Sequence, residues 1–433
     1  MKKYDIVVVG GGPAGLNASK VASSHGYKTL LVERDERLGG ILNQCIHNGF
    51  GLKFFGEELT GPEFVHKMLE DFENKNLDIL TNSFVTKINK GQVEITNAEG
   101  VQKIMCKAVI LTTGARERTA GGVSLLGSRP AGVYTAGFAQ KMINHHGKLV
   151  GKKAVILGSG DIGLILARRL KFEGAEVAGI FEIGKTSAGL QRNIRQCVED
   201  FDIPLEYSST IIQVVGTDRV EGVWVAKVDD NKKPLEETKR FVECDCVLLS
   251  VGLIPETELL KNQIDFFGGS ANAKVDENRM TSLDGVFVAG NSLHIHDLAD
   301  NAAEEGEIAA LGAINYINNK NKQKTFDVVC DKNISYCIPQ IVHENAQNIK
   351  LFFRVKSKLK KAKIKLTQNG ETLIDKFCPA ILPPLRLVLL AFSTRSFSSL
   401  FSSNSLVISS ASLFISAFNG SISMYLVICS TAF

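Results

Sequence analysis

The sequence predicts an α/β protein in which one strand–helix–strand unit is inserted into another, and a small β-module follows. A stretch of the form G-x-G-x-x-G occurs at residues 10–15 and again at residues 158–163, each time between an apolar strand and a helix. Two further strand patterns, at residues 108–118 and 281–291, flank the second copy. Short alternating strands occupy residues 326–375. We therefore expect the second unit to interrupt the first.

Composition bounds the class of protein. The chain has 433 residues, 44% of them hydrophobic and 22% charged, which is typical of a globular protein of two or three domains. Its net charge of +4 indicates neither a nucleic-acid nor a membrane partner. The nine cysteines form no dense framework, and the apolar run in "MKKYDIVVVGGG" is too short for a signal peptide. We expect a reducing, cytoplasmic setting.

Each part of the first glycine-rich stretch suits a dinucleotide. Gly10 makes the tight turn, Gly12 lets the backbone approach a pyrophosphate, and Gly15 lets the helix pack on the strand. The N-terminus of the helix offers N–H donors to phosphate. Glu33, 23 residues after Gly10, is placed to accept hydrogen bonds from a ribose. The predicted residues of this Rossmann-like site are Gly10, Gly12, Pro13, Ala14, Gly15, Glu33 and Arg34.

The second copy repeats the pattern inside the first domain. A strand at Lys153–Leu157 precedes it, and Glu182 follows Gly158 by 24 residues. An acid at that position bonds the adenosine ribose and repels a 2′-phosphate, so we expect NAD, while nearby Lys185 and Arg192 leave NADP open. The predicted residues of this second Rossmann-like site are Gly158, Gly160, Asp161, Ile162, Gly163, Glu182 and Gly252.

Two other segments favour FAD at the first site. "AVILTTGARER" (108–118) and "TSLDGVFVAGN" (281–291) resemble the second and third flavin-contact motifs of flavoproteins with two dinucleotide domains. Asn291 stands where those flavoproteins usually have Asp, and an amide there can still donate and accept hydrogen bonds. The residues that this resemblance adds to the FAD site are Gly40, Thr113, Gly114, Ala115, Gly290 and Asn291.

Residues 1 to about 325 resemble the pyridine nucleotide-disulfide oxidoreductase superfamily. "GGILNQCIHNGFG", "RPAGVYTAG", "LGSGDIGLILARRL" and "GNSLHIHDLAD" resemble one branch of it, the bacterial FAD-dependent oxidoreductases found with glycerol-3-phosphate dehydrogenase. That branch is similar to the flavin subunits of opine oxidases and cyanide synthase. The resemblance implies an FAD domain at 1–118 and 251–322, an NAD(P) domain at 119–250 and a β-module at 326–376. It implies no particular second substrate.

The segment "LGGILNQCIHNGFG" (38–51) holds one cysteine where many disulfide reductases place two. Cys45 has no second cysteine within ten residues, and no C-x-x-C occurs in the second unit. Dithiol chemistry is therefore not expected. We favour Cys45 as a small residue packed beneath the flavin. The alternative is a single catalytic Cys45 whose pKa His47 lowers.

His294 and His296 follow the flavin-contact Gly290 and are the other catalytic candidates. Either ring could move protons to a flavin or a substrate. In the alternative interpretation they order a loop through backbone hydrogen bonds. Adjacent His145 and His146 cannot face one ion together, so we expect no metal site.

From about Cys378 the chain contains no Lys, Asp or Glu, and residues 405–433 carry no charge at all. We favour a frameshifted or otherwise non-native tail over residues 378–433. A membrane-associated anchor and a structured extension are the alternatives.

These observations predict an FAD-dependent NAD(P)H oxidoreductase without a redox-active dithiol. Hydride would pass between nicotinamide and flavin, and electrons would go to or come from an unidentified small molecule or protein. One alternative is a flavin-binding electron-transfer subunit serving a partner such as glycerol-3-phosphate dehydrogenase. A weaker one is a single-cysteine peroxide or disulfide reductase.

Overall fold

The structure is a computed structural model that describes residues 2–268, 272–319, 324–344, 346, 349–357, 359–368, 371–381, 386–391 and 423–430. The chain forms two compact units. The first comprises Met1–Asn43, His47–Gly114 and Pro255–Phe433, and the second comprises Gln44–Ile46 and Ala115–Ile254. The predicted α/β fold with one unit inserted in the other is confirmed. No helix among the described residues has the length and apolar character needed to cross a membrane.

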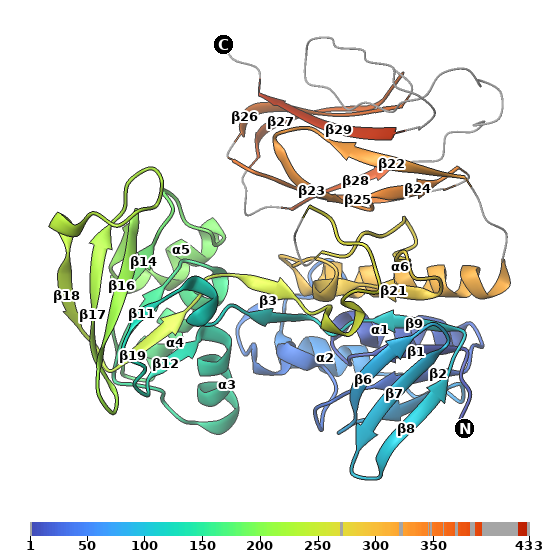
Figure 1. The fold of residues 1–433 in the computed structure, drawn as a ribbon, viewed down its shortest axis with the longest axis horizontal. Helices are drawn as coiled ribbons and strands as arrows, with labels where there is room; N and C mark the ends of the chain where they lie inside the picture. Colours follow the sequence, from blue (N-terminus) through green and yellow to red (C-terminus); the bar gives the residue numbers. More distant parts are fainter. Residues whose placement is uncertain are drawn as a thin grey trace. The chain divides into compact units, whose positions relative to one another are not determined.

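The first unit is built on a five-stranded parallel sheet with the order β21-β9-β1-β2-β5 (Figure 1). Its strands are β1 (Ile6–Val9), β2 (Thr29–Val32), β5 (Leu77–Leu80), β9 (Ala108–Leu111) and β21 (Val286–Val288). Four of them, β1, β2, β9 and β21, are buried along their whole length. Continuous apolar strands are expected where both faces of a parallel sheet are covered.

The two faces of this sheet have different covers. Ile6 and Val8 of β1 share an apolar cluster with helical residues such as Leu16. Val7 and Val9 point the other way, into a cluster with residues of an antiparallel sheet. The helices are α1 (Pro13–Ser24), α2 (Gly61–Leu69) and α6 (Ala299–Asn318), and the antiparallel strands are β6 (Phe84–Asn89), β7 (Gln92–Asn97) and β8 (Gly100–Met105).

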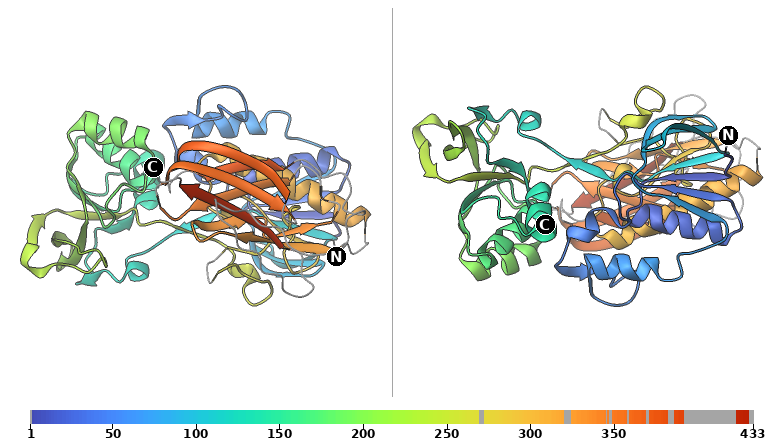
Figure 2. Two further views of the ribbon diagram at one scale, coloured as in Figure 1. Left: turned by 90° about the horizontal axis from the view of Figure 1, so that it is seen from above. Right: turned by 90° about the horizontal axis from the view of Figure 1, so that it is seen from below.

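Helices α1 and α6 lie side by side on the helix-covered face of the parallel sheet (Figure 2). Small residues make the approach close, since a Cβ added to Gly306 would lie 2.0 Å from the Ala14 carbonyl oxygen. The Asn17 side chain donates to the Ala303 carbonyl at 2.8 Å. The segment between β2 and α2 contains the short strands β3 (Asn48–Phe50) and β4 (Leu59–Thr60).

The second unit repeats the same plan. Its parallel sheet has the order β12-β19-β13-β14-β15. A second, four-stranded sheet has the order β11-β16-β17-β18, in which β11 and β16 are parallel and the other two pairs are antiparallel. The parallel strands are β12 (Val133–Thr135), β13 (Lys153–Leu157), β14 (Glu176–Glu182), β15 (Leu205–Tyr207) and β19 (Cys246–Leu249). The other elements are α3 (Ala136–His146), α4 (Asp161–Phe172), α5 (Gln191–Cys197), β11 (Leu126–Gly127), β16 (Ser209–Gly216), β17 (Val220–Lys227) and β18 (Arg240–Glu243). The chain enters and leaves through two paired strands, β10 (Ala115–Glu117) and β20 (Leu253–Pro255).

The C-terminal β-module belongs to the first unit and has two sheets that face each other (Figure 1). One has the order β24-β22-β29-β26-β27, and the other has the order β23-β25-β28. The strands are β22 (Thr325–Cys330), β23 (Ile334–Ile338), β24 (Ile341–His343), β25 (Ile349–Val355), β26 (Leu359–Gln368), β27 (Glu371–Ile381), β28 (Arg386–Ala391) and β29 (Ser423–Ser430). The last two strands come from the segment expected to be a non-native tail. Residues 382–385, 392–422 and 431–433 of that tail lie outside the described residues, so the origin of the tail stays a prediction.

Strand β25 separates two apolar clusters. Leu351, Phe353 and Val355 pack inside the module. Phe352, on the opposite side of the strand, belongs instead to the apolar cluster of the parallel-sheet core, which also contains Val9 and Val288. Because side chains alternate along a strand, Lys350 and Arg354 share the side of Phe352. This side of β25 contacts the part of the first unit that carries the predicted flavin loop.

Candidate functional site

The first glycine loop fits a pyrophosphate. Gly10 has φ +105°, and a Cβ added there would lie 2.5 Å from the Thr112 carbonyl oxygen, so only glycine suits the turn. A Cβ on Gly15 would lie 1.8 Å from the Gly10 carbonyl oxygen. A Cβ on Gly12, by contrast, would meet no atom within 4 Å. The backbone in front of the N-terminus of α1 is therefore open to an approaching phosphate.

Glu33 ties this loop to the end of β2. The side chain is buried, and Oε2 accepts a hydrogen bond from the Gly11 N–H at 2.6 Å. The other oxygen accepts from the Asp35 N–H at 2.9 Å. The Gly11 contact places the carboxylate beside the loop, and its contact with a ribose stays a prediction. Arg34 is exposed and Pro13 opens α1.

The second copy has the same geometry. A Cβ on Gly158 would lie 2.4 Å from the Ser250 carbonyl oxygen, and one on Gly163 would lie 2.5 Å from the Ser250 Cβ. Glu182 is buried, and its Oε2 accepts from the Ser159 N–H at 2.9 Å and from the Ser159 hydroxyl at 2.6 Å. Glu182 thus repeats the relation of Glu33 to its own glycine loop.

Other predicted residues of the second site have structural partners. Asp161 Oδ1 accepts from the Leu190 N–H at 2.8 Å and from the Asn193 amide at 2.7 Å, which fixes the segment after β14. Ile162 packs against the apolar cluster of the helices. Gly252 has φ +98°, and its carbonyl accepts from the Arg118 N–H at 3.1 Å.

The predicted flavin motifs of the first unit come together in space. A Cβ added to Gly40 would lie 3.2 Å from the Gly12 Cα, and one added to Gly290 would lie 2.7 Å from the Ala14 Cβ. The first glycine loop therefore lies close to both Gly40 and Gly290. Asn291 Oδ1 accepts from the His296 N–H at 2.8 Å.

Thr113 and Gly114 lie where β9 gives way to β10. The Thr113 hydroxyl donates to the Glu256 carbonyl at 2.6 Å, and the Glu256 N–H donates to the Gly114 carbonyl at 3.0 Å. Ala115 is the first residue of β10. The hydroxyl of Thr112, a residue that was not among the predicted site residues, lies 2.9 Å from the carbonyl oxygens of Val9 and Gly10. The repeated threonine in "LTTG" is the only sequence signal for it.

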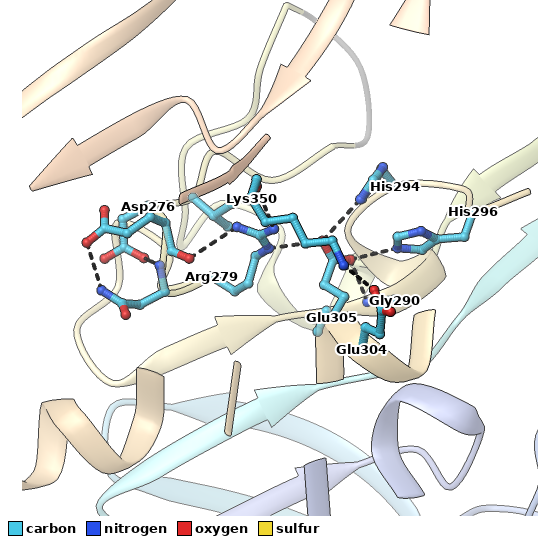
Figure 3. A network of polar contacts seen from close by, with 12 residues as sticks. Asp276, Arg279, Gly290, His294, His296, Glu304, Glu305 and Lys350 are labelled. Carbon is cyan, nitrogen blue, oxygen red and sulfur yellow. Dashed lines mark hydrogen bonds and ion pairs between the residues drawn. The ribbon is translucent and has the colours of Figure 1, made fainter. Parts of the chain in front are cut away.

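A buried carboxylate lies next to Gly290. Glu305 of α6 has no exposed surface. Its Oε1 lies 2.9 Å from Arg279 Nε and 3.1 Å from His294 Nε2. Its Oε2 lies 2.9 Å from the Gly290 N and 2.8 Å from His296 Nε2 (Figure 3). Burial alone would raise the pKa of Glu305, but the charges of the two histidines and Arg279 hold that pKa well below its usual range.

Both candidate histidines therefore meet at one carboxylate. Their ring centroids are 4.2 Å apart, and the Phe352 ring lies 5.2 Å from His294 and 5.5 Å from His296. The bonds that order this loop run through the Glu305 side chain as well as through the backbone. Sequence reasoning missed Glu305 and Arg279. For Glu305, the one sequence feature that could have indicated a buried role is its position among the alanines of α6.

The His294, His296 and Glu305 ligand atoms lie within 4.8 Å of one another, which is close enough to consider a metal ion. Both carboxylate oxygens, however, already accept bonds from Arg279 or Gly290. A guanidinium 2.9 Å from the carboxylate would repel a divalent cation. This set of donors fits a hydrogen-bonded carboxylate, and we assign no metal to it.

Cys45 lies in the second unit, with its Sγ 4.0 Å from the Gln140 side-chain oxygen. Burial raises the pKa of the Cys45 thiol to about 12. The His47 Nδ1 lies 2.9 Å from the Asn48 carbonyl oxygen, and the His47 ring packs on Phe50. Burial disfavours the thiolate, so this shift runs opposite to the alternative in which His47 lowers the Cys45 pKa.

Asp300, at the start of α6, is a second acid that sequence reasoning missed. Its Oδ1 accepts from the N–H groups of Lys53 and Phe54 at 3.0 and 2.9 Å, and its Oδ2 accepts from the Gly51 N–H at 3.2 Å. Asp300 thus ties the loop that follows β3 to the helix that follows the predicted flavin motif.

Known proteins and one protein family match most of this chain. The family described as "Pyridine nucleotide-disulphide oxidoreductase" matches residues 4–306. Hydrogen cyanide synthase subunit HcnB of Pseudomonas protegens is 25% identical over 325 residues, which cover 70% of this chain and 67% of that protein. A thioredoxin reductase of Ureaplasma parvum is 27% identical, with 73% of this chain and 98% of that protein covered. The "34.2 kDa protein in rubredoxin operon" of Clostridium pasteurianum is 26% identical, with 74% and 99% covered.

Solved structures show the same fold. The thioredoxin reductase of Lactococcus lactis superposes with a TM-score of 0.59 at 20% identity and covers 73% of this chain and 99% of its own. That of T. acidophilum also gives 0.59, at 22% identity, with 74% and 100% covered. The matched region contains both glycine loops and both acids described above. FAD and NAD(P)H are accordingly the cofactors of this chain.

Proposed function

Because the chain belongs to the pyridine nucleotide-disulphide oxidoreductase family, we propose that it is an FAD-dependent NAD(P)H oxidoreductase. The flavin, when bound, exchanges hydride with the nicotinamide and passes electrons to or from a further molecule. One structural observation gives the main support for this proposal. The same acid-to-loop contact occurs twice, from Glu33 to Gly11 and from Glu182 to Ser159, so one chain has two dinucleotide sites.

The residues have separate tasks in this proposal. Gly12 and the N-terminus of α1 hold the FAD pyrophosphate, and Glu33 holds the adenosine ribose. Gly290 and Asn291 border the flavin end. The second site takes NAD in preference to NADP, because the buried Glu182 carboxylate would repel a 2′-phosphate.

The electron path in this proposal uses no dithiol. Burial raises the pKa of the Cys45 thiol to about 12. Cys244 and Cys246 are also buried, which raises the pKa of each to about 12. Thiolates are the reactive form, so these positions favour packing over redox chemistry.

His294 and His296 act in this proposal by holding the loop that borders the flavin. Their Nε2 atoms face Glu305, and both side chains are buried. We therefore propose them as positioning residues.

A second candidate function is electron transfer to or from a partner protein in the cytoplasm. One relative is by name a subunit of hydrogen cyanide synthase, and another is encoded in a rubredoxin operon. The sequence resemblance to flavoproteins found with glycerol-3-phosphate dehydrogenase makes that enzyme the first partner to test.

Anaerobic titration of the purified protein with NADH tests the main proposal. Bleaching of the flavin absorbance at one NADH per FAD is the expected result, and chromatography of the released flavin should give FAD. A folded protein that releases FMN or no flavin would contradict the proposal. A second assay follows NADH oxidation with an artificial dye as electron acceptor, first with the purified protein alone and then with glycerol-3-phosphate dehydrogenase added. This assay separates the two functions, because the rate of NADH oxidation depends on the partner only if the protein is an electron-transfer subunit.

A further inference from the structure

We propose that the C-terminal β-module positions the predicted flavin loop, residues 290–298, through the side of β25 that faces away from the module core. This inference rests on the proposed function, because it takes the flavin to lie beside Gly290 and Asn291. The family match ends at residue 306, and thioredoxin reductase structures are covered almost completely by 73–74% of this chain. The module is thus an addition to the shared fold, and its contacts indicate what it adds.

Three consecutive outward side chains of β25 reach this region. Arg354 Nη2 lies 2.7 Å from Asp297 Oδ1, within the loop itself. The Phe352 ring packs against both histidine rings of the loop. Lys350 forms an ion pair with Glu304, the neighbour of Glu305 on α6. One strand therefore contacts the loop and the helix that follows it.

The backbone of β25 joins the same network through a buried arginine. Arg279 is 1% exposed, and its Nη2 lies 3.4 Å from the Lys350 carbonyl oxygen. Arg279 Nε binds Glu305, and Glu305 in turn accepts the Gly290 N–H (Figure 3). A continuous series of bonds thus runs from the module to the backbone at the predicted flavin contact. The Arg279 guanidinium also lies 5.6 Å from the centre of the Phe352 ring.

These contacts should affect the flavin in a measurable direction. Reduction adds negative charge to the flavin, and nearby cations stabilise that charge. Replacing Arg354 by a neutral residue removes a cation beside the loop and loosens Asp297. The loss of this positive charge beside the loop disfavours the negatively charged reduced flavin, so the midpoint potential should fall.

The test compares Arg354→Gln with Asp327→Asn. Asp327 of β22 pairs with Lys274 at 3.3 Å, so Asp327→Asn also breaks an ion pair between the module and the rest of the first unit, but outside the loop. The side chains of Arg354 and Lys274 are 30% and 34% exposed, which makes the cations of the two pairs comparable. The potential is measured by equilibrium with a reference dye during enzymatic or dithionite reduction. Thermal unfolding and FAD content are recorded for each variant.

We expect Arg354→Gln to bind FAD, to shift its midpoint potential to lower values and to slow reduction by NADH several-fold. Arg354→Lys should restore part of the shift because it returns the charge, and Asp327→Asn should keep the wild-type potential. An unchanged potential in Arg354→Gln, or an equal shift in Asp327→Asn, would overturn the positioning role. Failure of NADH to reduce the wild type would contradict the proposed function alone, since the dye equilibrium measures the potential without NADH.

Discussion

Arg279 and Glu305 form an ion pair that is closed to solvent, with 2.9 Å between Nε and Oε1 and side chains 1% and 0% exposed. All four groups around the carboxylate face it with a nitrogen. Removing one charge of such a pair leaves the other buried without compensation.

Glu305→Gln should therefore destabilise the first unit by roughly 3–5 kcal/mol. The side-chain NH2 group of glutamine would face the hydrogen-bond donors that surround the carboxylate of Glu305, so it could not accept their hydrogen bonds. Thermal unfolding followed by circular dichroism measures the loss. Glu307→Gln is the control on the same helix, because Glu307 is exposed, and it should change stability by less than about 0.5 kcal/mol. Equal effects of the two substitutions would contradict the importance of the buried pair.

Gly12→Ala should keep the fold and lose FAD. The φ of −75° at Gly12 suits alanine, and the added Cβ would meet no protein atom within 4 Å, so it would obstruct only an incoming pyrophosphate. Gly15→Ala should instead destabilise the protein, because its Cβ would lie 1.8 Å from the Gly10 carbonyl oxygen. Flavin absorbance and unfolding temperature distinguish the two. A yellow Gly12→Ala protein with wild-type FAD content would place the pyrophosphate elsewhere.

Glu182→Ala should narrow the preference for NADH over NADPH by about 1–2 kcal/mol, the scale of one hydrogen bond to a charged group. The measurement is the rate of flavin reduction by each nucleotide under anaerobic conditions. Glu199→Ala, an exposed acid of the same unit, serves as the control and should leave the preference unchanged. Equal rates with both nucleotides in the wild type would speak against the role of Glu182.

Cys45→Ser should leave electron transfer from NADH to the flavin intact. Burial raises the Cys45 pKa to about 12, so at neutral pH the side chain is a thiol without nucleophilic character. Dithionite titration should take about two electrons per FAD in both proteins, because the flavin alone is reduced. Extra electron equivalents that disappear in Cys45→Ser would instead support a single-cysteine reductase.

His343 should make the module contact sensitive to pH. The hydrogen bond from His343 to Glu277 raises the His343 pKa above its ordinary 6.5, against the opposing effect of burial. Its stabilisation is therefore complete below about pH 6.5 and is lost as pH rises through the higher pKa of the folded state. Compared with wild type, His343→Gln should unfold at a lower temperature in mild acid, and the difference should shrink toward alkaline pH. A difference that stays constant across this range would exclude the titration of His343 as its cause.

Local patterns allowed the two dinucleotide loops to be predicted from sequence. Each glycine loop and its acid, such as Glu33, lie within one strand–helix–strand segment, where spacing along the chain sets spacing in space. The carboxylate cluster could not be predicted in this way. Arg279 precedes β21 and Glu305 lies in α6, and nothing in residue type or period indicates that the two meet. Only packing of the folded chain brings them to the same histidines.

The contacts of strand β25 could not be predicted for a related reason. The alternation in "NIKLFFRVKS" predicts a strand, but it does not show which segments of the chain cover the two sides of that strand. In the structure both sides are covered, because Phe352 reaches the core of the parallel sheet. A charged residue on a strand indicates solvent only when nothing else supplies an opposite charge, and here Glu304 and Asp297 do so.

The pairing of β21 with β9 also constrains how the protein is made. Val286 lies opposite Val109, so the edge of the first sheet stays open while the ribosome synthesises the entire inserted unit. An apolar strand left unpaired for that time is prone to pair with other chains. The sheet of the inserted unit is complete at β19, so that unit can close before β21 emerges, while the length of the wait is set by translation. Translation speed across residues 115–254 should therefore influence the yield of folded protein.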